Sequence, residues 1–224
     1  MSTTSPSQKR RIFLVDDHPL VREWLTNLIN QQGDLLVCGE ADTAPKALST
    51  ISKLKPDIAI IDISLQDSSG LELVKDLREL NPKLAMLVLS MHDEVLYAER
   101  ALRAGARGYI MKRETTRNVI EAIHRVLDGK LYISASVAEQ IAARSVSGKA
   151  TEHQNPIELL SDRELEVFQM LGEGLGTRQI SDALHVSIKT VQVYCGRMKE
   201  KMNLGSATEL LREAIRWNES KTKE

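Results

Sequence analysis

The sequence DIAIID at residues 57–62 places four apolar residues between two acids. An unbroken apolar run of this length predicts a strand buried on both faces, as in a parallel sheet covered by helices. Asp62 would then lie at the carboxyl end of a strand, where open α/β sheets form their binding crevice. Taken alone, however, Asp62 is better explained as an acid that caps the polar loop at residues 64–70.

Three other predicted strands also lead into charged or hydroxyl residues. These strand ends carry Asp16 and Asp17, Ser90, and Lys112. Parallel strands bring their carboxyl ends to one edge of a sheet, so these side chains and Asp62 are expected to share one pocket. Three carboxylates there would repel one another, and a divalent cation relieves that repulsion. Mg²⁺ fits best, because it binds few carboxylates and keeps sites for water and a phosphoryl oxygen.

Asp62 is therefore a candidate nucleophile. A carboxylate can attack phosphorus to give an aspartyl phosphate, while the metal and Lys112 offset the charge on the transferring group. These residues and Tyr109 have the order and approximate spacing of the receiver domain of two-component response regulators, which residues 9–130 resemble.

The resemblance implies a role for each matched residue. Asp62 would be the phosphoacceptor for a sensor histidine kinase, Ser90 and Tyr109 the switch pair, and Lys112 the matching lysine of the family's site. The magnesium ligands would be Asp16, Asp17, Asp62 and the backbone carbonyl of Ser64. Two departures from the family pattern, at residues 65–66 and at Arg113, concern loop geometry, because neither position supplies a reacting group.

Apolar strands alternate with amphipathic helices from residue 11 onward. The predicted strands are 12–15, 35–39, 58–62, 85–90 and 108–111, and the predicted helices are 19–31, 44–54, 70–80, 94–104 and 117–128. This alternation predicts right-handed crossovers and a doubly wound, five-stranded parallel sheet. We expect the flavodoxin-like strand order 2-1-3-4-5.

Composition sets broad limits on the protein. The chain has 224 residues, 27% of them charged and 42% hydrophobic, which is typical of soluble globular proteins with one large or two ordinary domains. Cys38 and Cys195 are far apart and are interpreted as core residues in a reducing compartment. No apolar run approaches the length of a membrane span, so we expect a cytoplasmic protein without membrane contact.

Residues 131–156 are predicted to be a linker. One short helix is possible at residues 137–143, and the composition of residues 145–156 is typical of a connecting segment. Residues 1–8 are expected to be disordered.

Residues 157–220 are predicted to form a second, smaller, all-α domain. Ser161 and Glu164 form a capping box for a helix that ends near Gly172. Helices at 177–184 and 187–202, joined by a tight turn, indicate a helix-turn-helix.

The helix at 187–202 has two distinct faces. Apolar residues recur at helical spacing and predict one buried stripe, made of Ile188, Val191, Cys195, Met198 and Met202. The candidate DNA contacts are Lys189, Thr190, Gln192, Val193, Gly196, Arg197 and Lys199. Residues 185–203 hold four Lys or Arg and one acid, whereas residues 151–224 hold ten Lys or Arg and twelve acids. Positive charge is thus local to this helix, as phosphate contact requires, although a solvated bundle helix explains the stripe equally well.

A second resemblance covers residues 157–217. The motifs LSDRELEV at 160–167, EGL at 173–175, QI at 179–180 and VSIKTV at 186–191 resemble the LuxR-type DNA-binding domain. A receiver followed by this domain is the architecture of the NarL/FixJ family, and it implies a DNA partner and a homodimer when phosphorylated, often through the last helix, here 207–217. Gln192 and Gly196 replace lysines common in that family, and Tyr194 replaces a common histidine.

The favoured function is a phosphorylation-gated DNA-binding transcriptional regulator. The alternative is a receiver used as a phosphate-independent scaffold, with a helical domain that binds protein. An enzyme is not expected, because no separate base, nucleotide loop or substrate pocket is visible. His18 is interpreted as shaping a turn with Pro19, and His92 shares no ligand spacing with the other histidines.

Overall fold

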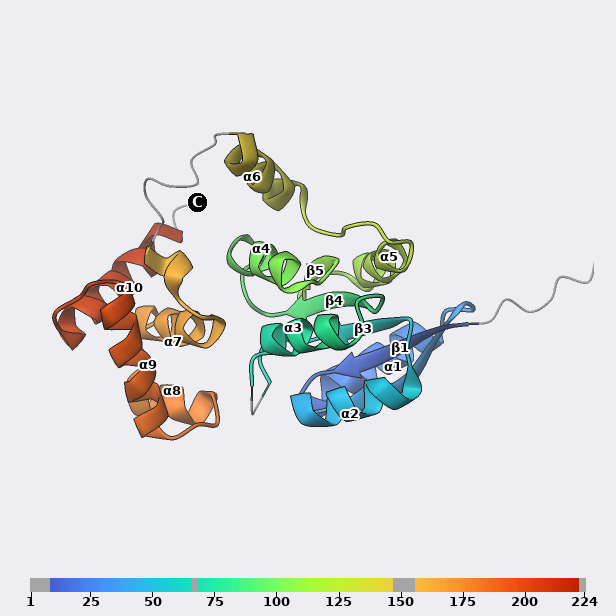
Figure 1. Ribbon diagram of the computed structural model, residues 1–224, viewed down its shortest axis with the longest axis horizontal. Coiled ribbons are helices and arrows are strands. Elements are labelled where there is room, and N and C mark those ends of the chain that lie inside the picture. Colours follow the sequence, from blue (N-terminus) through green and yellow to red (C-terminus); the bar gives the residue numbers. More distant parts are fainter. Residues whose placement is uncertain (1–8, 66–67, 147–155, 222–224) are drawn as a thin grey trace, which may run out of the picture. The chain divides into compact units, whose positions relative to one another are not determined.

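The computed structural model describes residues 9–65, 68–146 and 156–221. The chain divides into two compact units between residues 147 and 148 (Figure 1). Residues 1–8 and most of segment 145–156, for which disorder and a linker were predicted, lie outside the described residues.

The first unit contains a five-stranded parallel sheet. Its elements are β1 (Arg10–Val15), α1 (Pro19–Asn30), β2 (Leu35–Ala41), α2 (Ala44–Leu54), β3 (Ile58–Ile61), α3 (Gly70–Leu80), β4 (Ala85–Ser90), α4 (Glu94–Ala104), β5 (Gly108–Met111) and α5 (Thr116–Leu127). The strand order is β2-β1-β3-β4-β5, and every neighbouring pair is parallel. The predicted doubly wound fold is confirmed.

Helices cover both faces of this sheet (Figure 1). On one face, alternate strand residues such as Ile12, Ile60 and Leu89 form a continuous core with α1 and α5. On the other face, α2 packs on β1 and β2, and α4 packs on β5. All four residues of β3 are buried, as the apolar run at its centre predicted.

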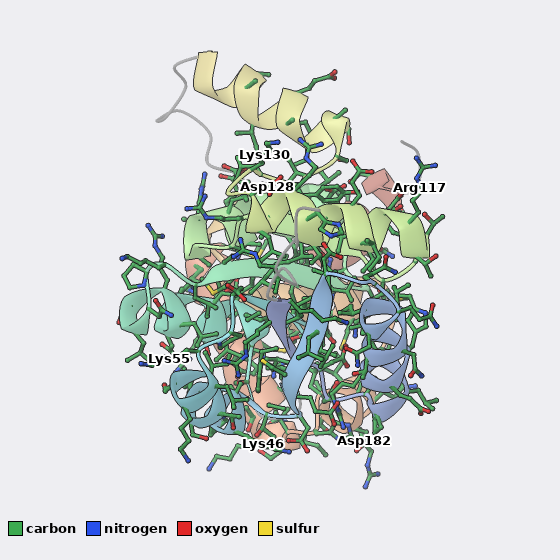
Figure 2. The ribbon with its side chains drawn as sticks, turned by 90° about the vertical axis from the view of Figure 1, so that its right-hand side faces the viewer. Lys46, Lys55, Arg117, Asp128, Lys130 and Asp182 are labelled. Carbon is green, nitrogen blue, oxygen red and sulfur yellow. The ribbon has the colours of Figure 1, made fainter. Side chains whose placement is uncertain are left out.

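Local sequence signals mark the boundaries of several of these helices. Lys55 follows α2, and its left-handed backbone (φ 49) ends the helix. Figure 2 labels this residue, and it also labels Asp128 and Lys130, which follow α5. The side chains of Asp93 and Thr115 accept hydrogen bonds from backbone N–H groups at the starts of α4 and α5. Such caps satisfy N–H groups that have no partner within the helix.

A sixth helix, α6 (Ala135–Val146), belongs to the first unit and is longer than the predicted 137–143. Ser134 explains the earlier start, because its Oγ accepts a hydrogen bond from Val137 N at 3.3 Å and its carbonyl accepts one from Ala138 N at 3.1 Å. Helix α6 packs against α4, and its Val137 is buried.

The second unit is helical. It contains the short 3-10 helix η1 (Pro156–Leu159) and the helices α7 (Asp162–Gly172), α8 (Thr177–Ala183), α9 (Ile188–Lys201) and α10 (Ala207–Lys221). The capping box at the start of α7 is confirmed. His185 adopts a left-handed backbone (φ 52) in the tight turn between α8 and α9. Within the described ranges, no helix has the length and apolar character needed to cross a bilayer.

The predicted apolar stripe of α9 is only partly buried. Val191 and Met198 are fully buried, but Ile188 is 39% exposed, and Cys195 and Met202 are half-buried. Ile188 is the first residue of α9 and follows the exposed cap residue Ser187, whereas the buried residues Val191 and Met198 lie further along the helix. Cys38 and Cys195 were predicted to be core residues. Both are free thiols that are only half-buried.

Glu164 connects the start of α7 to the end of α9. Its buried carboxylate accepts hydrogen bonds from Ser161 N at 2.7 Å and from Lys201 Nζ at 2.6 Å. Burial opposes its charge, but these hydrogen bonds lower the pKa of Glu164 below its usual 4.5. A lowered folded-state pKa means that Glu164 stabilises the unit above pH 4.5, and that this stability is lost as pH falls through the folded pKa.

We predict that Glu164→Gln lowers the free energy of unfolding at pH 7 by roughly 1–3 kcal/mol, because Lys201 and Ser161 lose a charged acceptor. The loss should shrink as the pH falls below 4.5. Urea unfolding at several pH values measures this, with the exposed Glu200→Gln as control. An equal loss at every pH would contradict the assignment.

Candidate functional site

The carboxyl edge of the sheet brings the predicted pocket residues together. Val15 lies beside Ile61 in the register of β1 and β3, so the next residues, Asp16 and Asp62, emerge side by side. Asp62 N donates a hydrogen bond to Val15 O at 2.8 Å, which extends this pairing by one residue. Lys112 emerges in the same way after β5, where its backbone N donates to Ser90 O at 2.8 Å.

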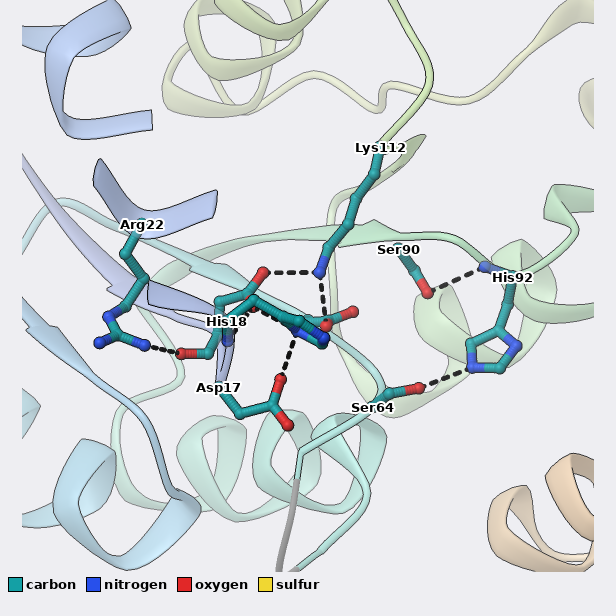
Figure 3. A network of polar contacts seen from close by, with 9 residues as sticks. Asp17, His18, Arg22, Ser64, Ser90, His92 and Lys112 are labelled. Atoms are coloured by element: carbon teal, nitrogen blue, oxygen red, sulfur yellow. Dashed lines mark hydrogen bonds and ion pairs between the residues drawn. The ribbon is translucent and has the colours of Figure 1, made fainter. Parts of the chain in front are cut away.

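Lys112 bridges two buried carboxylates. Its Nζ lies 2.6 Å from Asp62 Oδ2 and 2.6 Å from Asp16 Oδ2 (Figure 3). The side chains of Asp16 and Asp62 are each 3% exposed, and that of Lys112 is 9% exposed. One ammonium group therefore serves two carboxylates in a place that water scarcely reaches.

Burial and charge change the acid–base properties of this cluster. Burial raises the pKa of Asp62 to about 6, and Asp16 adds to the rise although Lys112 opposes it. Burial also disfavours the charged form of Lys112, but the carboxylates of Asp62 and Asp16 outweigh it and raise the pKa of Lys112. The lysine is thus held in its charged form.

Asp17 and His18 complete a cluster of potential metal ligands. One ligand atom from each of Asp16, Asp17, His18 and Asp62 lies within 4.8 Å of the others. Asp17 Oδ1 is buried and, among the described residues, receives no hydrogen bond of normal geometry, although His18 Nδ1 lies 2.7 Å away. The position of this oxygen favours a cation as its partner.

His18 shapes a turn, as the sequence predicts, and its ring also makes contacts that the sequence did not predict. Its carbonyl accepts hydrogen bonds from Val21 N and Arg22 N at the start of α1, as a turn-shaping residue would. Its ring also lies against the carboxylates, 3.2 Å from Asp16 Oδ1. No ligand spacing predicted this contact, because it arises from the turn itself.

His92 connects the pocket to the proposed switch residues, and Figure 3 shows its contacts with Ser64 and Ser90. Its Nε2 lies 2.8 Å from Ser64 Oγ, its backbone N donates to Ser90 Oγ at 3.2 Å, and its carbonyl accepts from the Tyr109 hydroxyl at 2.7 Å. Tyr109 is fully buried, and burial raises its pKa. Sequence reasoning missed His92, since only the folded loops bring these groups together.

Gly70 is required by close packing behind the pocket. A Cβ at this position would lie 1.8 Å from the backbone oxygen of Asp62, and Gly70 N donates to Ile63 O at 2.7 Å. Only a residue without a side chain allows α3 to begin this close to the strand end that carries Asp62.

In the second unit, the outer face of α9 is accessible. Lys189, Gln192, Val193 and Arg197 are exposed, and the other candidate contacts, Thr190, Gly196 and Lys199, are half-buried. The Thr190 hydroxyl lies 2.8 Å from Ser187 Oγ at the helix start. Lys201, which was counted in the basic cluster, instead pairs with Glu164.

Comparisons with known proteins cover both units. Residues 12–124 match the response regulator receiver domain, and residues 158–214 match the bacterial regulatory proteins of the luxR family. The transcriptional activator protein ExaE of Pseudomonas putida is 37% identical over 204 residues, which are 91% of this chain and 95% of ExaE.

Solved structures of response regulators are also similar to this chain, and two of them illustrate the likeness. A two-component response regulator of the LuxR family from Aurantimonas sp. SI85-9A1 is 33% identical, with a TM-score of 0.58 over 62% of this chain and 99% of that one. RcsB of Salmonella enterica serovar Typhimurium, bound to promoter P1flhDC in the presence of phosphomimetic BeF3-, has a TM-score of 0.59 over 92% of this chain and 98% of that one. RcsB is only 23% identical, so this likeness concerns the fold.

We predict that Gly70→Ala lowers the free energy of unfolding of the first unit by about 1–3 kcal/mol or more, because the new methyl group collides with backbone rather than with a movable side chain. Chemical denaturation measures the loss. Gly33→Ala is the matched control, since its Cβ would meet no described atom within 4 Å. Equal stability of the two variants would show that α3 can shift away from Asp62.

Proposed function

The chain belongs to the NarL/FixJ family of two-component response regulators, and we propose that phosphorylation of Asp62 controls DNA binding by the second unit. The family consists of transcription factors, not enzymes. The observation that carries the proposal is the buried pair of carboxylates held by one lysine at the carboxyl edge of the sheet.

Asp62 would act as the nucleophile. One of its carboxylate oxygens forms a bond to phosphorus, and the P–N bond to a phosphohistidine of the sensor kinase breaks, so that the imidazole leaves. Lys112 already lies 2.6 Å from Asp62 Oδ2 and would remain close to the oxygens of the new phosphoryl group. Its charge offsets the negative charge that the transfer brings into a buried site.

The donors of this site fit Mg²⁺. Asp16, Asp17, Asp62 and the backbone carbonyl of Ser64 supply the oxygen ligands that Mg²⁺ prefers. The buried Asp17 Oδ1, which lacks a hydrogen bond of normal geometry from the described residues, supports this choice. When bound, Mg²⁺ neutralises charge around the transferred phosphoryl group. The ring of His18 would then orient Asp17 rather than bind the metal, since Mg²⁺ prefers oxygen.

Ser90 and Tyr109 would form the switch. A phosphoryl group adds about 1.5 to 2 negative charges, so the hydroxyl of Ser90 is expected to turn towards it. Tyr109 already occupies the buried position, with its hydroxyl bonded to His92 O. Phosphorylation would favour this arrangement over others as a population shift, and dimerisation would follow from it.

Helix α9 would bind DNA through its exposed face. Lys189, Arg197 and Lys199 would contact phosphates, Thr190 would lie at the helix start, and Gln192, Val193 and Gly196 would face bases in the major groove. A Cβ on Gly196 would meet no described atom within 4 Å, so packing inside the chain does not require glycine there. A mid-helix glycine costs about 1 kcal/mol relative to alanine, which supports a close approach of DNA to this point.

We further propose a homodimer in the phosphorylated state and a cytoplasmic location, where the DNA lies. The alternative, a phosphate-independent scaffold, accounts poorly for a buried set of Asp16, Asp62 and Lys112, because buried like charges are costly unless they have a use.

We predict that Asp62→Asn abolishes the mass gain when the protein is incubated with a small phosphodonor and Mg²⁺, because an amide cannot form the acyl phosphate. Intact-mass measurement detects the change. Asp57→Asn, at the other end of β3, is the matched control and should react normally. A full mass gain in the Asp62 variant would exclude Asp62 as the phosphoacceptor.

We predict different effects for two substitutions on α9. Lys189→Ala should weaken binding to all duplexes about equally and reduce the salt slope by about 1, whereas Gln192→Ala should cost roughly 1–3 kcal/mol on the cognate site only. Binding isotherms at several salt concentrations separate the two effects, with the exposed Lys130→Ala as control. Unchanged affinity in both variants would favour the protein-binding alternative for this unit.

A further inference from the structure

The chain remains attached to the receiver after α5 ends. Tyr132 forms a parallel bridge with Gly108 of β5: its backbone N donates to Arg107 O at 3.0 Å, and its carbonyl accepts from Tyr109 N at 2.8 Å. We call residues 131–137 the strap. It adds a short sixth strand position beside β5, next to the proposed switch residue Tyr109.

A second anchor fixes the strap to α4. Ser134 N donates a hydrogen bond to Glu94 Oε1 at 2.7 Å, and Glu94 is the first residue of α4. Beyond Ser134, the strap enters α6, where the buried Val137 packs and α6 contacts α4 (Figure 1). The strap is therefore held by β5 on one side and by α4 on the other.

A cavity of about 170 Å³ lies beneath the strap. The residues that line it include Glu94, Tyr109, Met111, Asn118, Tyr132 and Ser134. Tyr109 borders this space, but its ring is fully buried and its hydroxyl is bonded to His92 O. Both anchors of the strap line this same cavity, through Tyr132, Ser134 and Glu94.

We propose that the strap senses the position of the Tyr109 ring: a buried ring leaves the strap closed on β5 and α4, and an outward ring displaces it. This inference rests on the proposed function, because phosphorylation of Asp62 is what would hold the ring in the core. The strap includes the first residues of α6, the last helix of the first unit, so its closure would carry the state of the phosphorylation site along the chain beyond β5.

A passive role for the strap makes a different prediction. A segment that only covers the edge of β5 would protect that edge from pairing with other chains whatever Tyr109 does. If closure of the strap depends on Tyr109, it should change when the protein is phosphorylated and when the hydroxyl group of Tyr109 is removed. Amide hydrogen exchange distinguishes the two, because it reports local opening at single residues.

The first experiment measures exchange at the amides of Tyr109, Tyr132 and Ser134 with and without a small phosphodonor and Mg²⁺. We expect exchange at these amides to slow by about threefold to tenfold on phosphorylation, while Asp62→Asn shows no change. Unchanged exchange in protein with a full mass gain would overturn the strap proposal and leave Asp62 phosphorylation intact. Absence of a mass gain would instead overturn the proposed function. The second experiment would then test whether the strap responds to Tyr109.

The second experiment needs no phosphoryl group. Tyr109→Phe removes the hydrogen bond to His92 O, so the ring leaves the core more often, and exchange at Tyr132 and Ser134 should rise about threefold or more. Glu94→Ala should raise exchange at Ser134 about tenfold, and Glu94→Gln, which keeps an acceptor, should raise it less.

Glu114→Ala is the matched control, because Glu114 lines the same cavity and accepts a hydrogen bond from Asn118. It should leave exchange in the strap unchanged. If Tyr109→Phe leaves exchange at Tyr132 and Ser134 unaltered, the strap is a passive cover. A rise with Glu114→Ala equal to that with Glu94→Ala would show that the Glu94 anchor is not specific.

Discussion

The ammonium group of Lys112 lies between two buried carboxylates, and the receiver is arranged around that contact. Asp16 and Asp62 are each 3% exposed, and one cation 2.6 Å from both offsets their repulsion. The raised pKa of Asp62, about 6, shows that the compensation is incomplete, because burial still disfavours its charge. Such a site is kept at a cost in stability, which is the usual sign that buried charges serve a function.

Several loops around this pocket are joined to it by direct contacts. Gly70 lets α3 start against the backbone of Asp62, and His92 joins the loop after β3 to the loop after β4. The carbonyl of His92 also accepts the hydroxyl of Tyr109, whose backbone N pairs with Tyr132 beyond α5. A series of hydrogen bonds therefore runs from Ser64, in the loop after β3, through His92 and Tyr109 to Tyr132, which follows α5.

The second unit uses charge differently. Glu164 is buried and hydrogen-bonded, so it stabilises the packing of α7 on α9. Lys189 and Arg197, on the outer face of α9, remain exposed, as contact with a polyanion requires. Of the four cations counted from residue 185 to 203, Lys201 belongs to the packing, and the sequence count could not separate it from Lys189 or Arg197.

The sequence alone determined the features that depend on local patterns. Apolar runs and helical periodicity located every strand and helix of the sheet domain to within a few residues, and the capping box at Ser161 and Glu164 located α7. Strand ends also predicted that Asp16, Asp62 and Lys112 would meet, because the order of strands in a doubly wound sheet is limited to few solutions. These inferences succeed because backbone geometry and burial leave a repeating signal along the chain.

Tertiary structure alone decided the contacts between residues that share no pattern. The bonds of His92 to Ser64, Ser90 and Tyr109, the position of the His18 ring, and the pairing of Tyr132 with β5 all join loops whose paths depend on packing. The exposure of Ile188 shows the same limit, since periodicity identifies a face of a helix but not how far its neighbours extend. Spacing encodes which side of an element a residue occupies, whereas its partners are set by the positions of elements distant in the chain.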